Sequence, residues 1–222
     1  MPPHPRLRRV CRALIDHQAV PDWWPARSAF EVMAGAVLVQ NTRWVNAERA
    51  IASLRSAGRL AAASLARTPR KKIEALIRSA GCQSVKSRRL LNLASWVVSE
   101  GGVTRLRSHT TVELRGRLLA VHGIGPETAD AMLCFAFRRP VFVPDQYARR
   151  VLARLGLIPG AEICRYERLR HEVEDALRWP VGRMQQLHGA IVTLCQTACR
   201  PVPVCVNCGL RRQCEYYKNN DL

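Results

Sequence analysis

The sequence has few lysines, few acidic residues and no long apolar run. Only four of its 35 cationic residues are lysines, and 17 acidic residues leave a net charge of +18 over 222 residues. The longest uncharged apolar stretch, Val32–Val39, is much shorter than the roughly 20 residues that a membrane-spanning helix needs. The basic N-terminus is not followed by the apolar segment of a signal peptide. These absences exclude a transmembrane protein and predict that the chain is not secreted.

An excess of arginine is the most prominent property that remains. A chain this basic needs a polyanionic partner, and arginine stays charged and binds phosphate with a forked geometry. Nucleic acid and an anionic membrane surface would both fit, but no helix combines a strong basic face with a broad apolar one. With 48% hydrophobic residues the chain can bury a core of one large or two small domains. We therefore expect a folded nucleic-acid-binding protein.

Apolar residues recur at helical spacing along almost the whole chain, which predicts an all-α fold. Ser28 and Glu31 form a potential capping box at the start of one helix, and Thr68 before Pro69 is typical of another helix start. Val141–Val143 is the only strand-like run and is very short. Helices are expected at residues 28–40, 44–57, 68–77, 87–98, 111–121, 126–137, 146–155, 165–178 and 181–198.

Five of the nine cysteines lie between residues 195 and 214, which indicates a metal site in a reducing compartment such as the cytoplasm. Cys199, Cys205, Cys208 and Cys214 are spaced Cys-x5-Cys-x2-Cys-x5-Cys. Four thiolates in a compact loop suit a [4Fe-4S] cluster or a tetrahedral zinc ion. Cys195, one helical turn before Cys199, is an alternative first ligand. The isolated cysteines are expected to be buried small apolar residues: Cys11, Cys82, Cys134 and Cys164.

Residues 118–150 contain a candidate helix-hairpin-helix. A helix is expected to end at Val121, and the sequence His122-Gly123-Ile124-Gly125 connects it to a helix that begins with Pro126. Glycines on both sides of one apolar residue allow a sharp turn and a close approach of another backbone. The N–H groups of such a turn can face an anion such as phosphate. On the glycines alone, an ordinary αα-hairpin is the simpler interpretation.

The order of several motifs resembles the helix-hairpin-helix (HhH-GPD) DNA glycosylase superfamily, in particular its endonuclease III-like branch. The segments VLVQNTRW, GIGPETAD, AFRRPVFV with the following Asp145, LHGAIVTLC and the cysteine run occur in the family's order. The resemblance implies a six-helix barrel that carries the hairpin, an iron–sulfur cluster module and a cleft between the two. We assign residues 28–140 to the first module and residues 1–27 with 141–222 to the second.

By resemblance, Asp145 is the catalytic residue of N-glycosidic bond cleavage. Cleavage of that bond builds positive charge on the sugar, and a fixed carboxylate can stabilise this charge or orient a water molecule. An aspartate after proline and before a helix is also a good N-cap. The aspartate alone does not decide between these two roles, but the hairpin at the family's spacing favours the catalytic one.

The sequence also departs from the family. Bifunctional members carry a lysine at the hairpin position of Glu127, and this chain has no lysine between Lys86 and Lys218. A Schiff-base step needs such an amine, so we expect a monofunctional glycosylase that leaves an abasic site. The family usually has one more residue in the first cysteine gap. The choice of [4Fe-4S] over zinc rests on the resemblance.

The segments Trp23-Trp24-Pro25 and QNTRW look most like those of the endonuclease III-like alkylpurine glycosylases, which act on bases such as 3-methyladenine. A base that leaves the duplex needs flat apolar surfaces, and Trp24, Pro25 and Trp44 would supply them. An alkylated purine is already cationic and leaves without much acid catalysis. The alternative is that two of these aromatic residues belong to the core.

Further DNA contacts are implied by the same resemblance. Gln40 would fill the gap left by the flipped nucleotide, with Asn41 beside it, and Lys86 would lie in a second phosphate-contacting loop. A basic run such as this one is often only a solvated face. The expected contacts to the DNA backbone are Gly123, Ile124, Gly125, Thr128 and Lys86.

The predicted function is that of a monomeric enzyme that binds duplex DNA with a damaged base. A mismatch glycosylase for thymine or uracil opposite guanine, or for an oxidised base, is the alternative within the same class. A non-catalytic DNA-binding module held by an iron–sulfur cluster is the alternative of another class. The fold is predicted more securely than the preferred base.

Overall fold

The computed structural model describes residues 5–18 and 24–220, and every regular element in these two ranges is a helix. The all-α prediction is confirmed. Val141–Val143 is buried, and residues 140–145 run without regular structure into the helix that begins at Gln146. None of the helices in the described ranges is both long and apolar enough to cross a membrane.

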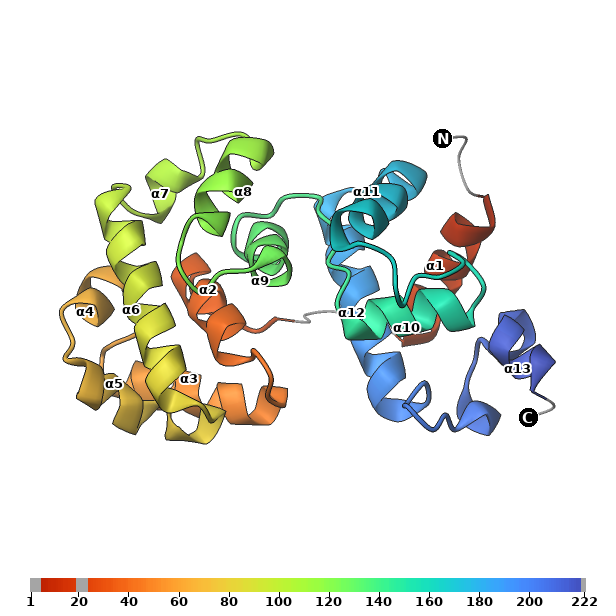
Figure 1. The fold of residues 1–222 in the computed structure, drawn as a ribbon, viewed down its shortest axis with the longest axis horizontal. Helices are drawn as coiled ribbons and strands as arrows, with labels where there is room; N and C mark the ends of the chain where they lie inside the picture. The colour runs from red at the N-terminus through yellow and green to blue at the C-terminus, as the bar shows by residue number, and fades with distance from the viewer. Residues whose placement is uncertain (1–4, 19–23, 221–222) are drawn as a thin grey trace. The chain divides into compact units, whose positions relative to one another are not determined.

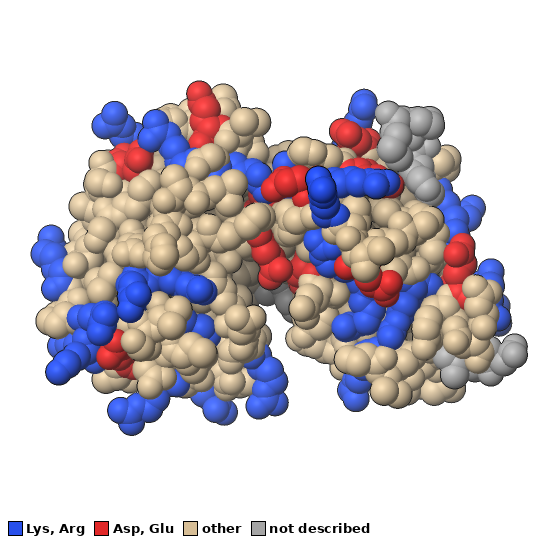
Figure 2. All heavy atoms as spheres, in the orientation of Figure 1, with Lys and Arg blue, Asp and Glu red and all other residues tan. Residues whose placement is uncertain are grey.

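The described chain separates into two compact units, which we treat individually. One consists of residues 24–139, and the other combines residues 5–18 with residues 140–220 (Figure 1). Lys and Arg side chains are distributed over the visible face of the first unit, with few acidic side chains among them (Figure 2). This distribution agrees with the strong excess of positive charge in the sequence.

Helix α2 forms the centre of the unit of residues 24–139. It is apolar almost all round, its side chains from Phe30 to Leu38 are buried, and it packs against α3, α6, α9 and η2. A helix that is apolar on all sides is stable only inside a core. The elements of this unit are α2 (Ala29–Leu38), α3 (Trp44–Ser56), α4 (Ala62–Ala66), α5 (Arg70–Leu76), η1 (Arg78–Ala80), α6 (Gln83–Ser99), α7 (Val103–Leu106), α8 (Thr111–Leu119), α9 (Pro126–Ala131) and η2 (Met132–Ala136).

The helix starts differ from the predicted ones in three places. The first is α5, which begins at Arg70 after the N-cap Pro69, while Thr68 donates to the Ser64 carbonyl instead of capping the helix. Ser28 caps α2 by accepting a hydrogen bond from the Glu31 N–H, but the Glu31 carboxylate pairs with Arg55 instead of closing the box. A complete capping box forms at Thr110 and Glu113, at the start of α8. Helix α6 begins at Gln83, four residues before the predicted start. The earlier start changes the position of Lys86, as described below.

In the second unit α12 packs against α1 and α10. The sequence analysis did not predict α1, although its buried residues Leu7, Val10 and Leu14 follow helical spacing. Arg6 of α1 donates hydrogen bonds to the carbonyls of Leu155 and Gly156, which ties α1 to the end of α10. The elements are α1 (Pro5–Gln18), α10 (Gln146–Arg154), α11 (Tyr166–Leu177), α12 (Val181–Thr197), η3 (Cys205–Asn207), η4 (Arg211–Gln213) and α13 (Glu215–Asn219).

Candidate functional site

Asp145 is the N-cap of α10, and its Oδ1 accepts a hydrogen bond of 2.7 Å from the Ala148 N–H. The side chain is half-buried. Burial raises the pKa of the Asp145 carboxyl to about 6, although the N–H groups of Ala148 and Tyr147 and the nearby arginines lower it. The carboxyl is therefore ionised above pH 6, and its N-cap role fixes its direction. Asp145 is therefore the N-cap of α10, and as an ionised carboxylate it can also stabilise a nearby cation.

The backbone just before Asp145 is held by Arg149, one helical turn further on. The Arg149 guanidinium donates to the carbonyls of Pro144 at 3.3 Å and Cys164 at 2.6 Å. It therefore links the entry of α10 to the loop that precedes α11. Sequence reasoning missed this residue, although its spacing of four from Asp145 placed it on the same helix face.

The hairpin between α8 and α9 forms as the glycine spacing predicted. Gly123 has φ +96°, and a Cβ atom there would lie 2.4 Å from Cγ of Arg89, so only glycine fits. The Ile124 N–H donates to the Val121 carbonyl at 3.0 Å, and the Ile124 side chain is buried. The expectation that the Ile124 amide faces outward is therefore wrong, because the turn itself uses it.

Gln40 lies against this hairpin. Its Nε2 donates to Oγ1 of Thr128 at 2.8 Å and to the Gly123 carbonyl at 3.4 Å, and its Oε1 accepts from Arg89 at 2.5 Å. Thr128 is nearly buried, whereas Asn41 is exposed with φ +52°. Two residues that were predicted to contact DNA separately, Gln40 and Thr128, are thus bonded to each other.

Lys86 corrects the predicted set of phosphate contacts. Its side chain is 3% exposed, and its Nζ donates to the carbonyls of Leu38 at 2.9 Å and Ala80 at 2.6 Å. Burial lowers the pKa of this amine. Because α6 starts before Lys86, the helix turns the side chain inward under the end of α2. The assignment of Lys86 to the DNA backbone is therefore wrong.

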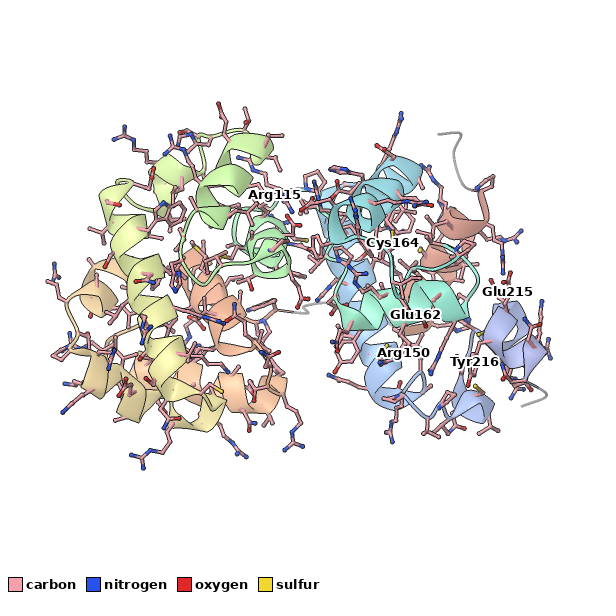
Figure 3. All side chains as sticks on the ribbon, in the orientation of Figure 1. Arg115, Arg150, Glu162, Cys164, Glu215 and Tyr216 are labelled. Atoms are coloured by element: carbon pink, nitrogen blue, oxygen red, sulfur yellow. The ribbon has the colours of Figure 1, made fainter. Side chains whose placement is uncertain are left out.

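A buried ion pair joins the two helices of the hairpin. Arg115, which projects from α8 (Figure 3), donates from Nε to Oδ1 of Asp130 on α9 at 2.7 Å and from Nη2 to Oδ2 at 3.1 Å. Asp130 is fully buried. A bidentate pair of this kind fixes both distance and orientation. The sequence analysis did not identify it, since the partners are 15 residues apart.

Trp24 contacts two other rings. Its centroid lies 5.3 Å from that of Trp44, at an interplanar angle of 76°, and 5.1 Å from that of Phe135. All three rings are half-buried, and Pro25 is exposed. Trp23, named in the sequence analysis, lies outside the described residues. The structure brings Trp24 and Trp44 into contact and adds Phe135, which sequence reasoning missed.

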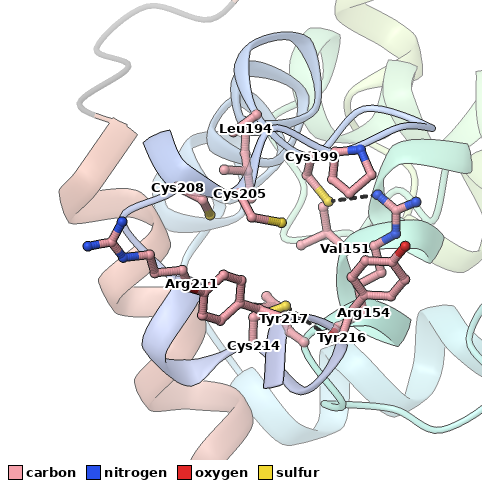
Figure 4. Close-up of a pocket in the computed structure, with 13 residues that line it drawn as sticks. Val151, Arg154, Leu194, Cys199, Cys205, Cys208, Arg211, Cys214, Tyr216 and Tyr217 are labelled. Carbon is pink, nitrogen blue, oxygen red and sulfur yellow. Dashed lines mark hydrogen bonds between the residues drawn. The ribbon is translucent and has the colours of Figure 1, made fainter. Parts of the chain in front are cut away.

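The four clustered cysteines line one cavity in the second unit. Figure 4 shows Cys199, Cys205, Cys208 and Cys214 around the same space, and Arg154 and Tyr216 also line it. Among the described residues no three His, Cys, Asp or Glu side chains are arranged around a single metal ion. The four thiols are half-buried. The donor set is four thiols at one cavity, a ligand type that suits both zinc and iron–sulfur clusters.

Hydrogen bonds prepare Cys199 to be a thiolate. Arg154 donates from Nη1 toward the Cys199 Sγ at 3.6 Å, and its guanidinium lies 4.7 Å from the Tyr216 ring centroid. The neighbouring Cys195 thiol lowers the pKa of Cys199, and Arg154 lowers it further. Burial raises the pKa of Cys208 and of Cys214.

Cys195 is buried on α12, and its thiol lies 3.8 Å from the Tyr147 carbonyl. It does not line the cavity, which favours Cys199 as the first member of the set. Among the isolated cysteines, Cys11 and Cys134 are buried as expected, but Cys82 is exposed and Cys164 is half-exposed. The expectation of burial is wrong for Cys82 because this residue caps α6 with φ +44° at the surface.

Several known DNA repair proteins are similar to this chain in sequence or in structure. MJ1434 of Methanocaldococcus jannaschii, a protein provisionally named as a DNA repair glycosylase, is 35% identical over 211 residues, which cover 94% of this chain and 95% of the relative. Endonuclease III of Thermotoga maritima is 28% identical over 192 residues, and the match covers 85% of this chain and 84% of the relative. The structure of H. pylori 3-methyladenine DNA glycosylase bound to 1,N6-ethenoadenine matches with a TM-score of 0.75 and 26% identity, over 86% of this chain and 97% of that one.

The family model covers the hairpin and Asp145 together. Residues 34–178 match the description "HhH-GPD superfamily base excision DNA repair protein". This range begins inside α2 and ends just after α11, so it includes the hairpin, the bonded pair of Gln40 and Thr128, and the N-cap of α10. The chain belongs to the HhH-GPD superfamily of base excision DNA repair proteins.

Proposed function

We propose that this DNA glycosylase is monofunctional and releases an alkylated purine such as 3-methyladenine from duplex DNA, leaving an abasic site. The observation that carries the proposal is Asp145, a half-buried carboxylate fixed at the start of α10 with its pKa raised to about 6. It is ionised at neutral pH and poorly solvated. A carboxylate in this state interacts strongly with a cation that forms nearby.

In the proposed reaction, Asp145 stabilises the positive charge that develops on the deoxyribose as the base departs. The hydrogen bond from the Ala148 N–H holds one carboxylate oxygen in place, so the charge needs no rearrangement at the moment of reaction. An alkylated purine leaves as a neutral base, and the site therefore needs no strong general acid. Water then attacks the sugar.

We expect no strand-cleavage step, because no lysine lies between Lys86 and Lys218, the stretch that holds the hairpin and Asp145. Glu127 occupies the hairpin position at which bifunctional relatives carry a lysine. Lys86 is deeply buried with its Nζ bonded to two carbonyls, so it cannot attack a sugar. A Schiff base needs an accessible unprotonated amine. We therefore expect little or no abasic-site lyase activity.

The expelled base would stack on Trp24 and Trp44, with Pro25 at the exposed edge. Gln40 would enter the duplex in place of the lost base, together with Asn41, once its bonds to the hairpin are exchanged for bonds to DNA. The backbone around Gly123 and Gly125, rather than Lys86, would contact phosphate. Binding through these groups and the surface arginines should weaken steeply as salt concentration rises.

We further propose that Cys199, Cys205, Cys208 and Cys214 hold a [4Fe-4S] cluster. Four thiolates could also hold a zinc ion, and the choice of an iron–sulfur cluster rests on the order of motifs that this chain shares with the endonuclease III-like branch of the superfamily. Each thiolate of a cubane cluster binds a different iron, which suits four thiols spread around one cavity. The cluster would supply covalent cross-links to a loop with little apolar core. Iron analysis and the visible absorption spectrum of the purified protein test this assignment.

Base release from a panel of oligonucleotides tests the proposed activity. The panel holds 3-methyladenine, 7-methylguanine, 1,N6-ethenoadenine, and thymine or uracil opposite guanine. The wild type should release the alkylated purines without strand nicking, and the rate should fall as the pH drops through about 6, where Asp145 becomes protonated. Asp145→Asn should lower the rate by at least about 1000-fold while duplex DNA is still bound.

Three results would contradict the proposal. Release of thymine or uracil alone would support the mismatch enzyme, and efficient borohydride trapping of a covalent DNA adduct would show a lyase. Full activity of Asp145→Asn would remove the carboxylate from the mechanism. Asparagine is itself a good N-cap, so Asp145→Asn should keep the start of α10 intact. A loss of activity in this variant would then come from the missing negative charge.

A further inference from the structure

The three half-buried rings of Trp24, Trp44 and Phe135 form an aromatic cluster in the unit of residues 24–139. Trp24 lies between the other two, with centroid distances of 5.3 Å to Trp44 and 5.1 Å to Phe135. The rings come from the segment before α2, from the first residue of α3 and from η2. Three distant segments therefore bring flat apolar surfaces to one place and leave each of them partly open.

Phe135 reaches this cluster because η2 is a π-helical turn. The Phe137 N–H donates to the Met132 carbonyl at 3.1 Å, which is the wide spacing of a π-helix. Met132, Leu133, Cys134, Ala136 and Phe137 are buried, so Phe135 is the one side chain from Met132 to Phe137 that is partly exposed. Such turns are frequent at functional sites because they redirect a side chain within a helix.

The backbone beneath Trp24 is also adapted to the ring. A Cβ atom on Gly35 of α2 would lie 3.3 Å from Cζ2 and Nε1 of Trp24, which is tighter than ordinary contact. The missing side chain thus lets the indole lie close to α2. Trp24 is therefore in close contact with α2 as well as with the two other rings.

We propose that Phe135 is a specificity-determining residue: with Trp24 and Trp44 it forms the surface on which the expelled base stacks, and it favours a cationic base. This inference rests on the proposed release of alkylated purines. A phenyl ring has no hydrogen-bonding group and cannot read the edge of a base. Its face attracts positive charge, which an N-alkylated purine carries in DNA and a neutral damaged base lacks.

Single-turnover base release by Phe135→Leu tests the inference. The substrates are duplexes with 7-methylguanine, which is cationic, and with 1,N6-ethenoadenine, which is neutral. Leucine keeps much of the apolar volume but removes the π face, so the rate for 7-methylguanine should fall roughly tenfold relative to the rate for ethenoadenine. Phe135→Tyr retains the ring and should keep the wild-type ratio.

Phe137→Leu is the matched control, because Phe137 lies on the same turn but is buried at 6% exposure. It should lower the melting temperature without changing the ratio of the two rates. A parallel fall of both rates in Phe135→Leu, or the same change of ratio in Phe137→Leu, would overturn the inference and leave the proposed function standing. A wild type that releases no alkylated purine would overturn both.

Discussion

The hairpin and the cysteine loop hold their shapes by different means. In the hairpin, the fully buried Asp130 is bonded by Arg115 through two short contacts, and Gln40 bonds the turn from α2. In the cysteine loop, residues 199–214, Leu210 is the one buried side chain, and Val202 and Val206 are largely exposed. The hairpin is organised by its own side chains, whereas the loop has little core of its own, and we propose that the cofactor bound by its thiols gives it order.

The largest effect of a single substitution is expected in the cysteine loop. Cys208→Ser should lose the cofactor and, with it, the order of residues 199–214, because binding free energy at such sites is folding free energy. Limited trypsin digestion should then cut at Arg211 and Arg212 many times faster than in the wild type. The unit of residues 24–139 should keep its helical content and its resistance to the protease.

Cys82→Ser is the control for this experiment, since Cys82 is exposed at the start of α6 and does not line the cavity. It should leave both the cofactor content and the digestion pattern unchanged. If Cys208→Ser keeps its iron and remains resistant at Arg211 and Arg212, the loop is stabilised by protein contacts and the contrast with the hairpin fails.

The next effect concerns the buried pair of the hairpin. Asp130→Ala should lower the free energy of unfolding by about 3–5 kcal/mol, because it leaves the Arg115 guanidinium, 14% exposed, without the carboxylate. Urea denaturation followed by circular dichroism measures the loss. The double variant Arg115→Met with Asp130→Leu should recover most of it, since an apolar pair of similar size carries no uncompensated charge. A double variant as unstable as Asp130→Ala would show that the pair is not the cause.

Local patterns in the sequence were sufficient for most of the longer helices and for the hairpin turn, but not for α1 or for the short helices α4, α7 and α13. Glycines around one apolar residue and a proline at the first position of α9 act within a few residues, so their effects do not depend on the rest of the fold. The cysteine spacing likewise placed four thiols around one cavity. The N-cap role of Asp145 follows from the same kind of local rule.

The residues that sequence reasoning missed or misplaced depend on contacts between distant segments. Lys86 was assigned to a phosphate-contacting loop by resemblance, whereas α6 already begins at Gln83 and places the Lys86 side chain under α2. Phe135 contacts Trp24 from a π-helical turn, which no simple periodicity predicts. The bond between Gln40 and Thr128 joins residues 88 positions apart. Such pairings follow from the packing of the whole unit.

The smallest effect is expected at the hairpin turn itself. Gly123→Ala places a Cβ atom 2.4 Å from Cγ of Arg89 at a φ of +96°, so the variant must strain the backbone and displace Arg89 from Gln40. Residues in such conformations cost about 1–3 kcal/mol, and the free energy of unfolding should fall by that amount.

Gly125→Ala is the matched control two residues away. Gly125 has φ −92°, and a Cβ atom there meets nothing within 4 Å, so its stability should change by less than about 0.5 kcal/mol. Adding Arg89→Ala to Gly123→Ala removes the clash but not the positive φ, and should recover part of the loss. If Gly123→Ala and Gly125→Ala are equally stable, Arg89 does not press on the turn, and the hairpin is less tightly organised than its contacts indicate.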